Sequence, residues 1–135
     1  MSHAAFSAKL FAIYVFIVGA VLAIAPNALL ALFRLPATSE VWIRLLGVIA
    51  FNVGVFAWVA AQHEDRHFFK ASVYTRCGAF AAIVAFVVLG LASPVVLLFG
   101  VAELAGAIWT GWALRADAVP GVRRHGAAVN QPGVP

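Results

Sequence analysis

Five polar residues lie inside long apolar stretches of this sequence and are the leading candidates for binding or catalysis. Three of them, Arg44, Arg76 and Glu103, are ionisable, and two, Asn52 and Tyr74, are uncharged. Charged groups are costly inside a lipid bilayer, so an ionisable residue within a membrane span is a functional-site hypothesis by default. We therefore predict a ligand-binding polar cluster made of Arg44, Asn52, Tyr74, Arg76 and Glu103.

Glu103 is the residue around which we expect this cluster to form. A carboxyl group alone in hydrocarbon stays protonated, whereas beside Arg44 or Arg76 it ionises and forms a charge-assisted pair. Three interpretations remain open at this stage. The pair is a buried structural contact that fixes helix register, or it is a ligand, proton or ion site, or both arginines extend to opposite headgroup layers and Glu103 faces a partner protein.

A second pattern, His63-Glu64-Asp65-Arg66-His67, matches the H-E-x-x-H motif of zinc peptidases. In that motif two histidines one helical turn apart bind the metal and the glutamate activates water. A catalytic zinc also needs a third protein ligand, and a polar loop between two membrane spans offers no walled cleft. We interpret His63, Glu64 and His67 as a chance match, and we predict neither a metal site nor a catalytic residue from them.

The composition indicates the surroundings in which these residues act. Of 135 residues, 64% are apolar and 10% are charged, against about 45–50% and about 25% in soluble domains. A chain of this length cannot bury so much apolar surface in a water-soluble core. The composition therefore excludes a disordered main body and a nucleic-acid module, and the single Cys77 excludes a disulfide scaffold.

Four apolar stretches are long enough to cross a bilayer, which takes about 20 helical residues. They run from about 10–25, 41–61, 71–91 and 95–114. The first resembles a signal peptide, but its length and the proline that follows it favour a retained helix. The sequence predicts an all-α fold: a four-helix transmembrane bundle over residues 1–114, with a short interfacial helix between Pro26 and Pro36. Residues 115–135 are expected to form a disordered, basic cytoplasmic tail.

The basic residues predict the orientation in the membrane. One side of the predicted bundle carries Lys9, Arg66, Lys70, Arg115, Arg123 and Arg124, whereas the other carries only Arg34 and, just inside a span, Arg44. Cytoplasmic loops are enriched in Lys and Arg. We therefore expect a multi-pass protein of a bacterial-type inner membrane with both termini in the cytoplasm.

The segment Arg44-Leu-Leu-Gly47 opens the second span, a basic loop joins the second and third spans, and the fourth span carries the acidic Glu103. This layout resembles the small bacterial four-helix membrane proteins of the DoxX-like type. Some proteins of that type are membrane subunits of quinone-linked sulfur or thiol oxidoreductase systems. The resemblance implies a partner-dependent role and an apolar, quinone-like ligand near Arg44 and Glu103.

The leading functional interpretation is an accessory subunit or a lipid- or quinone-binding module. Its expected partners are membrane lipids, a membrane or soluble oxidoreductase, and further copies of the chain, but no nucleic acid. Quinone and lipid are the only ligands this interpretation implies, and no dedicated cofactor is predicted. The alternatives are an oligomeric, proton-coupled transporter and a membrane-embedded enzyme that uses Glu103 as acid and base, with Tyr74 as an auxiliary proton donor.

Overall fold

The computed structural model describes residues 1–118, which form helices and connecting turns without any strand. The long helices are α1 (His3–Ile24), α3 (Val41–Gln62), α4 (Arg66–Val88) and α5 (Leu97–Ala116), and α5 continues the 3-10 turn η1 (Pro94–Val96). The three helices α1, α3 and α4, and the continuous segment η1–α5, are each long and apolar enough to cross a membrane. The predicted all-helical fold with four such helices is confirmed.

Helix α1 begins at His3, before the apolar stretch predicted from about residue 10, because polar groups cap its N-terminus. The Ser2 hydroxyl accepts a hydrogen bond from the Ala5 amide at 3.1 Å. The Asp117 carboxylate accepts hydrogen bonds from the amides of His3 and Ala4 at 3.3 and 3.0 Å. These groups satisfy amides that a helix start leaves without a partner.

Two other helix boundaries also differ from those of the predicted apolar stretches. Helix α4 begins at Arg66 rather than near residue 71, because the Asp65 carboxylate accepts hydrogen bonds from the amides of His67 and Phe68. Helix α5 runs to Ala116, so the first residues of the predicted tail are helical. The rest of that tail, 119–135, lies outside the described residues.

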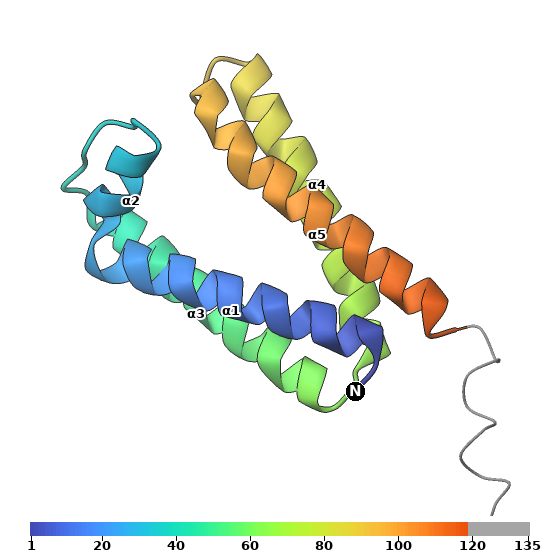
Figure 1. The fold of residues 1–135 in the computed structure, drawn as a ribbon. Helices are drawn as coiled ribbons and strands as arrows, with labels where there is room; N and C mark the ends of the chain where they lie inside the picture. Colours follow the sequence, from blue (N-terminus) through green and yellow to red (C-terminus); the bar gives the residue numbers. More distant parts are fainter. Residues whose placement is uncertain (119–135) are drawn as a thin grey trace, which may run out of the picture.

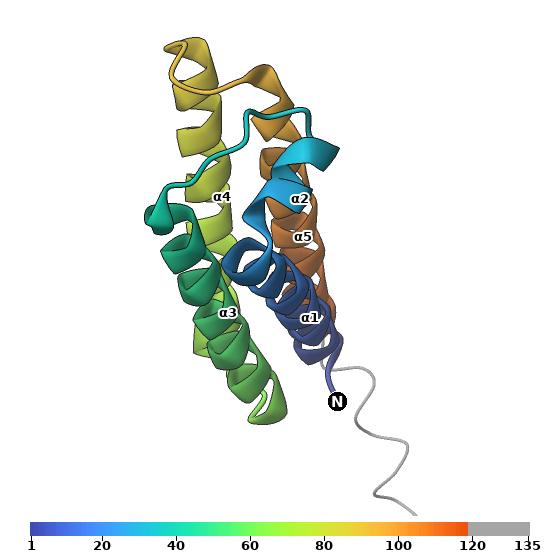
Figure 2. The same cartoon turned by 90° about the vertical axis from the view of Figure 1, so that its left-hand side faces the viewer.

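The four long helices form two antiparallel pairs, α1 with α3 and α4 with α5 (Figure 1). The pairs meet near the N-terminus and diverge toward the end that carries α2 (Figure 1), and the view turned by 90° shows α1 and α3 side by side (Figure 2). At the divergent end, the rings of Phe33 and Phe99 still meet, with 4.5 Å between their centroids. The two termini of the described chain lie at the same end.

The predicted short helix between the first two spans is present as α2 (Pro26–Leu32). Its first residue is a proline, which has no amide hydrogen to leave unpaired and has a backbone angle suited to a helix start. Asn27 and Thr38 exchange two hydrogen bonds across the connection to α3, at 3.1 and 2.9 Å. This clamp returns the chain to the start of α3.

Glycines allow the close approach of α1 and α3. A Cβ atom on Gly19 would lie 2.7 Å from the Gly47 carbonyl oxygen and 2.6 Å from the Phe51 amide nitrogen, and one on Gly47 would meet α1 backbone in turn. Small residues give membrane helices this kind of backbone contact. Gly78 of α4 is different, since no atom of another helix lies within 4 Å of its Cβ position.

Candidate functional site

Arg76 of α4 and Glu103 of α5 form an ion pair near the middle of their helices. The Nε of Arg76 donates a hydrogen bond to Oε2 of Glu103 at 2.9 Å. The Arg76 side chain is 9% exposed and that of Glu103 is 19% exposed. The prediction that a guanidinium from a neighbouring span accompanies Glu103 is confirmed, and the interpretation in which both arginines extend away from it is wrong.

Two further residues fix the position of the Arg76 guanidinium. Its central carbon lies 4.1 Å from the ring centroid of Phe11 in α1, a cation–π contact. On α5, Gly106 leaves the space that the guanidinium fills: a Cβ atom there would collide with Nη2 and lie 2.7 Å from Cζ. Arg76 of α4 is thus in contact with both α1 and α5.

The Arg76 guanidinium has N–H donors that its contact with Glu103 does not use. An arginine carries five N–H donors, and the Glu103 contact uses the one on Nε. Within residues 1–118, neither Nη1 nor Nη2 donates to a protein acceptor. No fully buried side-chain nitrogen or oxygen in this part of the chain lacks a partner, so both Nη atoms reach accessible surface. These N–H groups can therefore bind an acceptor that comes from outside the chain.

The accessible surface beside Arg76 is a hollow of about 280 Å³ between α1 and α5, which we call the Arg76 hollow. Apart from Arg76 its lining is Ser7, Leu10, Phe11 and Tyr14 of α1 and Ala102, Ala105, Gly106 and Trp109 of α5. The lining is mostly apolar and aromatic, with few polar groups, as is typical of small-molecule sites. Pocket volumes usually start near about 300 Å³, so the hollow suits the headgroup of a larger molecule.

A buried polar contact joins α1 and α5 beside the hollow. The Ser7 hydroxyl donates to the Ala4 carbonyl at 2.8 Å and lies 3.2 Å from the Thr110 hydroxyl. The Thr110 hydroxyl in turn donates to the Gly106 carbonyl at 2.9 Å. Both side chains are buried, and this network fixes the rotation of α5 against α1, which places Gly106 against the guanidinium.

The other predicted members of the polar cluster lie elsewhere, and for them the expectation of one common centre is wrong. Nη1 of Arg44 donates to the carbonyls of Ala23 and Ile24, both at 2.8 Å. Arg44 therefore caps the C-terminus of α1, where carbonyls lack partners and the helix dipole favours a cation. Asn52 and Tyr74 are exposed on the outside of α3 and α4, and Tyr74 is 77% exposed.

The H-E-x-x-H pattern spans the turn between α3 and α4 instead of lying on one helix. His63 follows the end of α3 and Glu64 has a positive φ of 51°, whereas His67 belongs to α4. Glu64 accepts a hydrogen bond from the Ser2 amide at 3.0 Å, so its carboxylate ties the turn to the N-terminus. Among residues 1–118, no three His, Cys, Asp or Glu side chains gather as a metal-ligand group.

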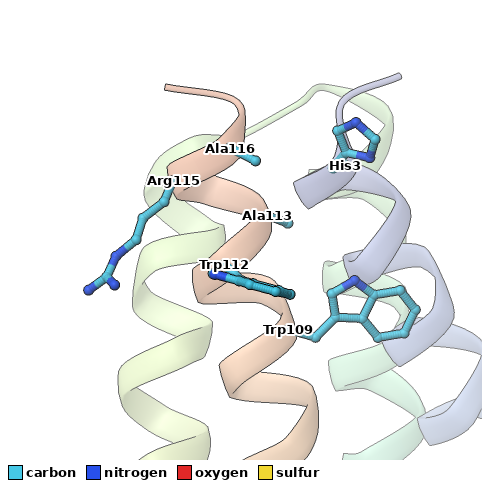
Figure 3. Close-up of a pocket in the computed structure, with 6 residues that line it drawn as sticks. All are labelled: His3, Trp109, Trp112, Ala113, Arg115 and Ala116. Carbon is cyan, nitrogen blue, oxygen red and sulfur yellow. The ribbon is translucent and has the colours of Figure 1, made fainter. Parts of the chain in front are cut away.

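A second hollow, of about 500 Å³, lies at the end of the bundle where the two termini meet. Its lining is His3, Trp109, Trp112, Ala113, Arg115 and Ala116 (Figure 3). The two indole rings lie toward the gap between α1 and α5, whereas the Arg115 side chain points away from His3 (Figure 3). Trp109 lines both hollows, so they adjoin along the α1–α5 groove.

Sequence reasoning missed the α1 residues of the site. Phe11 and Tyr14 are two of many aromatic residues in apolar stretches, and nothing in their types distinguishes a contact of Arg76 from ordinary packing. Gly106 lies in line with Ala102 and Thr110 at four-residue spacing, a pattern typical of ordinary helix packing. Its role needs the rotation of α5 against α4, which the sequence does not give.

A scan against protein-family models and searches of curated proteins and of solved structures find no match to the chain. The DoxX-like resemblance stays a prediction.

Proposed function

We propose that this protein is a membrane-embedded binding module for an amphiphilic ligand, a quinone or a lipid, whose headgroup occupies the Arg76 hollow. The observation that carries the proposal is the Arg76 side chain, which is nine-tenths buried and lines an apolar hollow, and whose two Nη atoms have no acceptor among residues 1–118. Leaving such donors without an acceptor costs free energy, and a ligand oxygen would remove that cost.

The shape of the hollow supports an amphiphile in particular. Leu10, Ala102, Ala105 and Trp109, on its rim, are all exposed, so the hollow opens sideways from the bundle. In a membrane this side faces acyl chains. A headgroup can then bind Arg76 while its apolar tail stays in the lipid, which suits a small hollow and a long ligand.

The proposed setting is a bacterial-type inner membrane with both termini in the cytoplasm, where the chain serves as an accessory subunit. Arg66, His67 and Lys70 crowd the start of α4, and a soluble or membrane oxidoreductase or a second copy of the chain would dock at this end. Neither the transporter nor the enzyme alternative has an observation of its own in its favour. A proton path needs polar groups in series, and Asn52 and Tyr74 lie outside the hollow.

Retention of an amphiphile during purification tests the proposal. The protein is purified in a gentle detergent, analysed by native mass spectrometry and extracted with organic solvent to identify what it carries. We expect a quinone or lipid in the wild type and its loss in Arg76→Gln. The matched control is Cys77→Ala, which changes the next residue of α4, an exposed one. Equal retention by Arg76→Gln and the wild type would refute the proposed site.

A further inference from the structure

We infer that the Arg76 hollow selects an uncharged carbonyl headgroup over an anionic one, and that Glu103 is the residue that determines this specificity. The inference rests on the proposed function and names the ligand class of that same site. An uncharged carbonyl oxygen is the acceptor of a quinone and also of an ester lipid. A carboxylate or phosphate would otherwise be the usual partner of an arginine.

The first step is the charge already present. The Arg76 side chain and the Glu103 carboxylate, joined at 2.9 Å, together carry no net charge. Among the residues that line the hollow, Arg76 is the one with a formal charge at neutral pH. An anion entering the hollow would be attracted by the guanidinium and repelled by a carboxylate on the same guanidinium. The free-energy cost of removing this anion from water would then be offset by little net electrostatic attraction.

The second step is the donors. The Glu103 contact engages Nε, whereas Nη1 and Nη2 of Arg76, a residue that lines the hollow, bond to no acceptor within residues 1–118. A neutral carbonyl gives up less hydration than an anion when it leaves water. Its hydrogen bond to a guanidinium is still charge-assisted, so it is stronger than a bond between two neutral groups. The balance of these effects favours the neutral acceptor.

The third step is the role of Glu103 itself. Its carboxylate is bonded to the guanidinium and is not among the groups that line the hollow, so it acts on the ligand through Arg76. Replacing it by glutamine keeps a side chain of the same size with a hydrogen-bond acceptor and removes the negative charge. The hollow of Glu103→Gln would then carry one net positive charge and accept an anion.

Two probes that differ in charge and by one methyl group test the inference, namely decanoate and its methyl ester, both radiolabelled. Decylubiquinone, a third probe, distinguishes a quinone site from an ester-lipid site. Binding to the full chain in nanodiscs is measured at neutral pH, with ligand expressed as its mole fraction in the lipid. The variants are Glu103→Gln and Arg76→Gln, and Tyr74→Phe, on the exposed side of α4, is the control.

We expect the wild type to bind the methyl ester or the quinone more tightly than decanoate. Glu103→Gln should raise the affinity for decanoate about tenfold or more, the usual size of a neighbouring charge effect, with little change for the neutral probes. Arg76→Gln should weaken binding of every neutral probe that the wild type binds. A wild type that prefers decanoate overturns the inference even if Glu103→Gln does not fold. An unchanged decanoate affinity in folded Glu103→Gln overturns it as well, whereas no binding of any probe overturns the proposed function too.

Discussion

At the residue scale, several polar groups in residues 1–118 have a structural role at a helix end. Asp65 caps α4, Asp117 caps α1, and Arg66 donates to the Leu114 carbonyl near the end of α5 at 3.2 Å. Arg44 does the same for the last turn of α1. The Arg76–Glu103 pair stands apart, because it lies mid-helix, where backbone groups already bond one another.

The pair predicts a non-additive response to mutation. Arg76→Leu leaves a buried carboxylate without its partner, so we expect it to lower the free energy of unfolding by about 3–5 kcal/mol. The double change to Arg76→Leu with Glu103→Leu should recover much of that loss, because no charge is left unpaired. Reversible unfolding in mixed detergent micelles measures both. A double variant as unstable as the single one would show that the pair does not couple the two residues.

Two glycines of α5 give a matched test of the space around the guanidinium. In Gly106→Ala the new methyl group would collide with the Arg76 guanidinium, so the pair with Glu103 must shift. In Gly111→Ala the methyl group would make an ordinary contact, 4.0 Å from a Val73 methyl carbon. Alanine is favoured over glycine in a helix by about 1 kcal/mol. We therefore expect thermal unfolding to occur at a lower temperature in Gly106→Ala and at an equal or higher one in Gly111→Ala.

At the element scale, hydropathy and length predicted which segments form long helices. The end positions depended on capping groups that a hydropathy pattern does not weigh, which is why α1 and α4 begin earlier than expected. The rotation of each helix could not be predicted. All four are apolar on every side, so Asn52 and Tyr74 carried no sign that they face outward. The sequence did predict a pair between Glu103 and either Arg44 or Arg76, and the structure shows Arg76 as the partner.

The α1–α3 contact predicts a strong effect of one methyl group. In Gly47→Ala the added carbon would meet the backbone of Ala23 and Gly19, which cannot move aside as a side chain can. We expect a loss of about 1–3 kcal/mol, the usual cost of overpacking. Gly78→Ala on α4 is the control, because no other atom lies near its Cβ position. Equal stability of the two variants in a detergent unfolding titration would contradict the close α1–α3 packing.

At the scale of the whole molecule, polar contacts link the helices of the described chain at the end of the termini, which we call the tied end. The two helix pairs diverge toward the opposite end, which we call the open end (Figure 1). The tied end combines the Asp117 cap of α1, the Glu64 bond to the Ser2 amide and the Ser7–Thr110 contact. The open end has the Phe33–Phe99 contact across the gap between the pairs. Both hollows are lined by residues of α1 and α5, and the Arg76 hollow lies nearer the middle of these helices. The arrangement combines polar contacts between the helices at the end of the termini with the Arg76 hollow, the proposed ligand site, on the side of the bundle.

This architecture predicts on which side of the membrane each connection lies. Because the termini share one end, the α3–α4 turn lies with them and the α4–α5 connection lies opposite (Figure 1). Lys9 lies in the first half of α1, Arg66 and Lys70 lie at the start of α4, and Arg115 lies in the last turn of α5. These basic residues are therefore nearer the end of the termini, which the positive-inside rule assigns to the cytoplasm. Single cysteines at two exposed positions, His67→Cys and Ser93→Cys, test this in a Cys77→Ala background. A membrane-impermeant thiol reagent should label Ser93→Cys in cells whose outer barrier has been opened, and His67→Cys only after lysis. The reverse pattern would invert the proposed orientation, and labelling of both positions before lysis would contradict a chain that crosses the membrane four times.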